Sequence, residues 1–296
     1  MPLSLTARLL RAARHAYDVT ASSVLADTAD SQPIGFIGEV DGFVRGIDRI
    51  DAALVGETAD GIIVAFRGTL PPDSPDHLQA ILDWAGDLDA ALVADPGGLS
   101  GHLHQGFLAA VDDLWPAVEP AVLARSKVNP AKPIYVAGHS KGGPLANIAA
   151  MRLRAKLPPP GPAKPGGTPI LVATFAGARP GDAIFAAGYD SAIPHSARYE
   201  YADDIVPHLP PSDELLSALQ NFGRLGARLQ SMNRGYASVG ELYFIDWSGA
   251  IEGDSPLLQL ERFVHLGRLI TGFDFATIVA DHSISLGSGY DKALDS

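Results

Sequence analysis

The chain has 296 residues, of which 47% are hydrophobic and 19% charged, enough apolar material for a large buried core and too much for a disordered chain. Its 22 basic and 34 acidic residues give a net charge of −12, which argues against nucleic acid or an anionic membrane surface as the main partner. Cysteine is absent, which excludes disulfides, cysteine nucleophiles and thiolate metal sites.

No segment of the sequence predicts export or membrane insertion. Arg8, Arg11 and Arg14 interrupt the apolar residues near the N-terminus, so we expect no signal peptide in this chain. A cytoplasmic protein and an exported protein whose signal has been removed both fit this pattern. No stretch approaches 18 uncharged apolar residues, so no transmembrane segment is expected, while transient contact with a neutral lipid interface is compatible with the composition. The oligomeric state is left open.

The first predicted elements are a helix and two strand regions. Residues 4–17 carry apolar positions at helical spacing, with Ser4 as the N-cap. Strand residues follow in 43–57, and a turn at 59–61 leads into the run Ile62–Phe66. This run is apolar without alternation, which is typical of a strand buried on both faces.

Strands and helices alternate along the rest of the chain. The predicted helices are 77–91, 106–126, 144–157, 213–235 and 255–272, and the predicted strands are 133–137, 170–175, 198–201 and 241–247. This alternation predicts a mostly parallel sheet with helices on both faces. A proline-rich stretch at 158–169 is interpreted as a surface loop, and no repeat or internal boundary is found, so we expect one domain over residues 1–296.

The most informative motif follows the 133–137 strand. Residues 138–142 read Gly-His-Ser-Lys-Gly and match G-x-S-x-G. A serine on a sharp strand-to-helix turn has strained backbone angles that expose its hydroxyl, and a Cβ at either flanking glycine would collide with the neighbouring strand or helix. The N-terminus of the following helix offers free N–H groups to a developing oxyanion. Ser140 is therefore a candidate nucleophile, and the alternative is an ordinary serine in a glycine-rich helix start.

A serine nucleophile needs a base within hydrogen-bonding distance and a carboxylate that orients this base. In α/β-hydrolase sheets the acid and then the histidine follow the serine along the chain. Only His208, His265 and His282 follow a plausible acid downstream of Ser140, so these three are the candidate bases. His265 lies in a helix-periodic segment. His282 follows an apolar stretch near the C-terminus, in a loop position from which a side chain can reach over the sheet edge. We therefore favour His282 and keep the other two as alternatives.

Two adjacent carboxylates, Asp203 and Asp204, follow the predicted strand that ends at Tyr201. Neighbouring residues of an extended chain point to opposite sides, so only one of them can face the histidine. The other is expected to be solvated or to cap the turn.

Several segments, in order along the chain, resemble the class 3 lipases, a branch of the α/β hydrolases that includes the fungal triacylglycerol lipases. The resembling segments are Phe66–Thr69, His102–Phe107 with its matching His104, Thr174–Asp182, Asp204–Pro211, Tyr236 with Val239–Gly240, and Asp281–His282. Together they span about residues 40–290. The resemblance implies an α/β-hydrolase fold and a serine carboxylic ester hydrolase that cleaves lipid or medium-chain acyl esters without a cofactor or a metal.

Carried over residue by residue, the resemblance makes Ser140 the nucleophile, Asp204 the orienting acid and His282 the base. It places the oxyanion hole at the backbone N–H groups of Thr69 and Lys141, with the Thr69 hydroxyl as a further donor. The residues themselves agree, because Lys141 directly follows the nucleophile and Thr69 ends a buried strand expected to lie beside it.

The chain departs from the family pattern in two places. Lys141 replaces a residue that is usually apolar, commonly leucine, and a cation there opposes the helix dipole. Its side chain is expected to contact an acidic group on a lid or on a substrate. The stretch 70–82, where fungal relatives carry a lid helix, is short and proline-rich. The candidate cap or lid segments are therefore two, 70–82 itself and the later segment 212–235.

Other family residues have structural interpretations. Arg67 is expected to hold a loop by ion pairing, His104 to form structural hydrogen bonds, and His139 to point away from the serine hydroxyl and pack the turn. A metalloenzyme is not favoured, because His102 and His104 form the only histidine pair near ligand spacing. Acyl transfer to an alcohol, and non-catalytic binding of an acyl ligand on the same fold, are the alternative functions.

Overall fold

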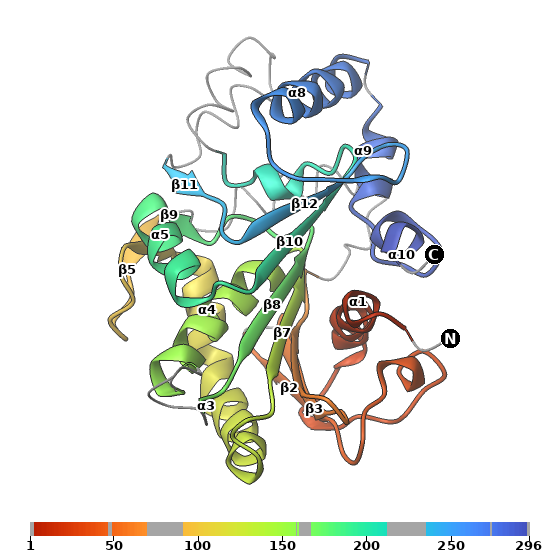
Figure 1. Ribbon diagram of the computed structural model, residues 1–296. Coiled ribbons are helices and arrows are strands. Elements are labelled where there is room, and N and C mark those ends of the chain that lie inside the picture. The colour runs from red at the N-terminus through yellow and green to blue at the C-terminus, as the bar shows by residue number, and fades with distance from the viewer. Residues whose placement is uncertain are drawn as a thin grey trace.

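The computed structural model describes residues 3–46, 49–69, 91–157, 159, 167–211, 235–272 and 274–294. The candidate lid segments 70–82 and 212–235 and the predicted helices 77–91 and 213–235 lie outside this part of the chain, except at their edges. The described residues build one large sheet covered by helices, and a second, smaller sheet (Figure 1).

The large sheet has nine strands in the order β1-β2-β3-β4-β7-β8-β10-β12-β13. Their bounds are β1 Ser23–Val24, β2 Asp41–Arg45, β3 Asp51–Glu57, β4 Ile62–Phe66, β7 Ile134–His139, β8 Ile170–Phe175, β10 Ser196–Tyr201, β12 Glu241–Ile245 and β13 Ile251–Glu252. From β4 to β12 neighbouring strands run parallel, and the pairs at both margins are antiparallel. The prediction of a mostly parallel sheet is confirmed.

The remaining elements are helices and the strands of the small sheet. The helices are α1 Leu5–His15, α3 Gln105–Val128, α4 Gly142–Lys156, α5 Ala183–Ala192, α8 Pro256–Thr271, α9 Phe275–Asp281 and α10 Gly289–Leu294. The small sheet has the order β11-β9-β6-β5, with β11 Tyr236–Ala237, β9 Gly181–Asp182, β6 His102–His104 and β5 Leu92–Ala94. Single 3-10 turns lie at Ala16–Asp18, Gln32–Ile34 and Val206–His208.

Helices cover both faces of the large sheet. In Figure 1, α3, α4 and α5 lie on one face, while α1 and α10 lie on the other. The sequence of strand β4 is apolar throughout because both faces of the strand are buried. Ile62, Val64 and Phe66 belong to the core beneath α3 and α4, whereas Ile63 and Ala65 belong to the core beneath α1. A strand buried on both faces carries no polar alternation, as the sequence predicted.

Candidate active site

The turn between β7 and α4 presents Ser140. Its φ angle of 56° lies in the left-handed region, which non-glycine residues rarely adopt. A Cβ on Gly138 would overlap the backbone of Gly142, and one on Gly142 would overlap the carbonyl group of Phe66. Both flanking positions therefore need glycine, and the strained turn expected from G-x-S-x-G is present.

Ser140, His282 and Asp204 lie together at the carboxyl ends of the parallel strands. The Nε2 atom of His282 is 3.0 Å from the Ser140 hydroxyl oxygen. The Nδ1 atom of the same ring is 3.0 and 3.1 Å from the two carboxylate oxygens of Asp204. An ionised carboxylate only accepts hydrogen bonds, so Nδ1 carries the proton and Nε2 is left to accept from the serine. This is the tautomer that a general base requires.

His282 directly follows α9 and forms its C-cap. The apolar stretch before it is this helix, which the sequence analysis did not predict. The other two candidate bases lie elsewhere: the Nε2 atom of His208 is 3.2 Å from Arg262, and the ring of His265 stacks on Trp247 with 3.8 Å between ring centroids.

Asp204 is held by two donors besides the histidine. The Val206 backbone N–H and the Tyr290 hydroxyl donate to it at 2.9 and 2.8 Å. Tyr290 lies in α10, is fully buried, and accepts in turn from the Tyr201 N–H. Burial and the charge of Asp204 raise the pKa of Tyr290 well above its ordinary value, so the hydroxyl remains a donor. No local motif marks Tyr290, and sequence reasoning missed it.

Asp203 takes a different role from the one expected. It is buried, and its carboxylate accepts from the indole N–H of Trp247 at 2.7 Å, so the expectation of a solvated or turn-capping group is wrong. Burial raises the pKa of this carboxyl group. Its backbone N–H donates to Asp281 at 3.1 Å, which ties the acid-bearing turn to the residue before His282.

His139 holds the backbone of the base. Its Nε2 donates to the carbonyl oxygen of His282 at 3.0 Å, so its Nδ1 accepts from the Tyr17 hydroxyl at 2.8 Å. Burial, reinforced by repulsion from His282 when that ring is protonated, holds the pKa of His139 well below its ordinary value. The two ring nitrogens thus bond to Tyr17 and to the His282 carbonyl oxygen, and the side chain connects the base to the N-terminal segment.

The two residues expected to form the oxyanion hole are Thr69 and Lys141, and the second lies in the turn between β7 and α4 itself. Thr69 follows β4, and its buried hydroxyl has no hydrogen-bond partner among the described residues. Lys141 follows Ser140 and precedes α4. Its ammonium group lies 2.5 Å from a carboxylate oxygen of Asp51, and both side chains are buried. The expected contact with a lid or substrate acid is therefore wrong, because Asp51 is the first residue of β3.

The contacts of Arg67 and His104 test the structural roles expected for these two residues. Among the described residues Arg67 pairs with no acid and donates instead to three backbone carbonyls, those of Val19, Arg49 and Ile50, at 2.7–2.9 Å. His104 forms structural hydrogen bonds as expected, since it caps α3 by accepting from the N–H groups of the first helical turn.

A family model, described as lipase (class 3), matches residues 63–214, just over half of the chain. The chain belongs to the class 3 lipase family. A lipase of Caenorhabditis elegans is 29% identical over 199 residues, covering 64% of this chain and 50% of that protein. A secreted mono- and diacylglycerol lipase of Fusarium solani is 33% identical over 109 residues, covering 37% and 30%. This chain thus spans half or less of the length of these curated relatives.

Solved lipase structures share the fold. The triacylglyceride lipase of Rhizomucor miehei superposes with a TM-score of 0.59 at 23% identity, covering 84% of this chain and 82% of that one. Lipase II of Rhizopus niveus gives 0.58 at 22% identity, covering 81% and 78%. The predicted α/β-hydrolase fold is confirmed.

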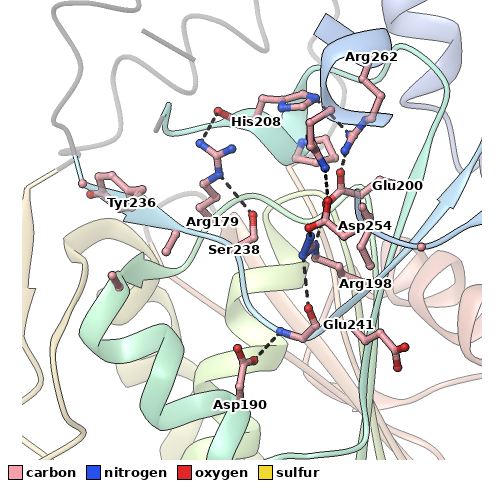
Figure 2. A pocket seen from close by; sticks show the side chains of 18 residues that line it. Arg179, Asp190, Arg198, Glu200, His208, Tyr236, Ser238, Glu241, Asp254 and Arg262 are labelled. Atoms are coloured by element: carbon pink, nitrogen blue, oxygen red, sulfur yellow. Dashed lines mark hydrogen bonds and ion pairs between the residues drawn. The ribbon is translucent and has the colours of Figure 1, made fainter. Parts of the chain in front are cut away.

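A cavity of about 790 Å³ lies apart from the triad, whose residues do not line it (Figure 2). Its most buried charges neutralise one another. Glu200 accepts from Arg262 at 2.5 Å and from Arg198 at 3.1 Å. Burial opposes ionisation of Glu200, but the two guanidinium charges outweigh it and bring its pKa to about 2. We interpret this cluster as a structural ion-pair network.

Within the described ranges, no group of three or more His, Asp or Glu side chains is arranged to hold a metal ion. None of the helices found there is long and apolar enough to cross a membrane.

Proposed function

We propose that the protein is a serine carboxylic ester hydrolase, a lipase or esterase that acts through an acyl-enzyme intermediate. The observation that carries this proposal is the 3.0 Å contact between His282 Nε2 and the Ser140 hydroxyl, with Asp204 on the opposite ring nitrogen. A serine hydroxyl is a weak nucleophile at neutral pH, and this arrangement supplies the base and the orienting acid that activate it.

In the first half-reaction the Ser140 oxygen attacks the acyl carbonyl carbon while His282 Nε2 takes the hydroxyl proton. The carbonyl oxygen becomes an oxyanion, which the backbone N–H groups of Thr69 and Lys141 stabilise. The intermediate then collapses: its bond to the alkoxy oxygen breaks, and His282 returns the proton to the leaving alcohol. Asp204 stays ionised and stabilises the imidazolium ion.

In the second half-reaction water attacks the acyl group on Ser140, again with His282 as the base. The second oxyanion collapses, the bond to Ser140 breaks, and the free acid leaves. The serine recovers its proton from the histidine. Besides the ester and this water, neither half-reaction needs a further reactant to balance.

Acylglycerols are the substrate class that we propose. Of the eleven exposed large hydrophobic side chains in the described part of the chain, five come from the short segment 247–264, namely Trp247, Ile251, Leu257, Leu260 and Val264. The first of these donates to Asp203, next to the proposed acid. These exposed apolar side chains, one of which contacts the residue before the proposed acid, support esters presented in a lipid phase. Both the diacylglycerol lipase and the triacylglyceride lipase named above are consistent with it.

We also propose that the chain forms a single domain, because the large sheet joins strands from residue 23 to residue 252. Of the alternative functions, non-catalytic acyl binding is disfavoured by the intact triad. Acyl transfer would use the same residues, and product analysis with added alcohol separates it from hydrolysis.

The test is hydrolysis of p-nitrophenyl esters of short and long acyl chains, below and above their solubility limits. We expect Ser140→Ala to lower kcat on the order of 10⁴–10⁶-fold, because removing a triad nucleophile forfeits the covalent route. The exposed Ser248, changed to alanine, is the matched control and should keep the wild-type rate. Wild-type activity in Ser140→Ala would refute the proposal. A rate jump on emulsified long-chain esters would support a lipase, and a preference for short soluble esters an esterase.

A further inference from the structure

Two ion pairs connect β3 with the residues flanking β7, across the intervening strand β4. At one end of the sheet Lys132 pairs with Glu57, the last residue of β3, at 2.6 Å. At the other end Lys141 pairs with Asp51, the first residue of β3, at 2.5 Å. The second pair lies at the carboxyl end of β7, which carries Ser140.

The two pairs differ in burial. The side chains of Lys141 and Asp51 are 5% and 6% exposed, whereas those of Lys132 and Glu57 are 12% and 34% exposed. A buried charge without a partner is strongly destabilising. In addition, Lys141 is the N-cap residue of α4, at the helix end where the dipole disfavours a cation. Lys141 therefore depends on Asp51 to keep its position in the turn.

The two residues just before Asp51 contact Arg67, on the segment that carries Thr69, the other expected donor. The carbonyl oxygens of Arg49 and Ile50 accept from the Arg67 guanidinium at 2.7 and 2.9 Å. Arg67 lies two residues before Thr69. Arg49 itself has a φ of 58°, a strained conformation for a residue other than glycine. Residues 49–51 thus contact Arg67, which lies two residues before Thr69, and also the side chain of Lys141.

We propose that residues 49–51 form a strap that positions the two backbone donors of the oxyanion hole relative to each other. This inference rests on the proposed ester hydrolysis, in which Thr69 and Lys141 supply those donors. Asp51 and Arg67 are positioning residues, since each acts through a donor residue and not on the substrate. The strap also explains a lysine where the family usually has leucine: an ion pair replaces apolar packing.

The test compares two double variants with matched chemistry. Asp51→Asn with Lys141→Met removes both charges of the strap's ion pair, so neither member of that pair is left as an unpaired buried charge and the chain should fold. Glu57→Gln with Lys132→Met removes the pair at the opposite end of the same strands. The readouts are kcat and KM on a soluble p-nitrophenyl ester, the inhibition constant of an alkyl boronic acid that mimics the tetrahedral intermediate, and Tm.

For the strap variant we expect kcat to fall about 10- to 100-fold, less than the roughly 10²–10³-fold cost of deleting an oxyanion donor, because the donor is displaced and not lost. KM should stay within about twofold, and the boronic acid should bind more weakly by a factor similar to the loss in kcat. The control variant should keep both values even if its Tm falls.

A folded strap variant with wild-type kcat overturns the inference, and so does an equal loss of kcat in both double variants. If the strap variant does not fold, Asp51→Glu decides, because it keeps the charge but lengthens the side chain by one methylene. It should lower kcat at unchanged KM, and wild-type kcat in Asp51→Glu would again overturn the inference. Failure of the proposed function is distinct, since the wild-type protein itself would then not hydrolyse the ester.

Discussion

Two acidic residues four positions apart, Glu200 at the end of β10 and Asp204 just beyond it, have opposite surroundings. Glu200 faces the charged cavity and is neutralised by Arg262 and Arg198. Asp204 instead accepts from Tyr290 and Val206, which carry no charge, and from His282. The charge of Asp204 is thus left for the imidazolium ion that forms during the reaction. The charged cavity around Glu200 is therefore not where we place the chemistry.

The largest expected effects come from the Asp204 side of this comparison. Asp204→Asn and His282→Ala should each lower kcat about 10⁴-fold, because the serine loses a correctly oriented base. Asp203→Asn, the adjacent control, should keep kcat within a few-fold, since its carboxylate contacts Trp247. Steady-state kinetics on a soluble ester measures all three, and the reverse ranking of the two aspartates would move the acid by one residue.

On the Glu200 side we expect a loss of stability without a loss of turnover. Arg262→Met leaves a buried carboxylate with one fewer partner, and should lower the free energy of unfolding by about 3 kcal/mol. Adding Glu200→Gln removes the uncompensated charge and should recover part of that loss. Urea unfolding gives the stabilities, and kcat per folded molecule should stay near wild type in both variants. A drop in kcat comparable to that of Asp204→Asn would mean that the cavity takes part in catalysis.

A smaller effect is expected for the hydroxyl that holds Asp204. Tyr290→Phe removes one donor to the carboxylate and should lower kcat about 3- to 10-fold, since a hydrogen bond to a charged group contributes roughly 1.5–3 kcal/mol and two other donors remain. Tyr189→Phe is the control, because this buried tyrosine donates to Asn147, away from the triad. It should lower Tm and leave kcat unchanged, and equal kcat losses in both variants would remove the special role of Tyr290.

The smallest effect concerns Asp281, which precedes the base. Burial, with added repulsion from Asp203 and Asp204, raises its pKa from 3.8 to about 6. The folded state therefore binds this proton more tightly than the unfolded state, so stability is favoured below about pH 4 and lost as pH rises through 6.

Asp281→Asn cannot ionise but keeps an oxygen that can accept from the Asp203 N–H. Because the group is partly exposed to solvent, we expect a gain of only about 1 kcal/mol at pH 7.5, vanishing near pH 4. Urea unfolding at both pH values measures it, and a gain independent of pH would show that this carboxyl group does not titrate as described.

The sequence predicted those parts of the site whose geometry is local. Gly138 and Gly142 flank a serine whose strained turn needs no distant partner, and the turn is present as expected. Strand β4 was equally predictable, because burial on both faces makes its whole sequence apolar.

The residues that sequence reasoning missed reach the site from distant segments. Tyr290, Tyr17 and Asp51 join it because α10, the 3-10 turn after α1, and β3 pack beside the β7 turn. Their neighbourhood depends on the strand order β3-β4-β7, and spacing along the chain does not encode this order. Arg67 was expected to pair with an acid, but in the described part of the chain it donates to the carbonyl oxygen of Val19 in the N-terminal segment and to those of Arg49 and Ile50 before β3.

Covalent labelling with a fluorophosphonate, followed by mass spectrometry of the digested protein, tests the central claim most directly. We predict one labelled residue, Ser140, with no labelling in Ser140→Ala and labelling slowed at least about 10³-fold in His282→Ala, since the base activates this hydroxyl. A label on another serine, or an unchanged labelling rate without the histidine, would contradict the account.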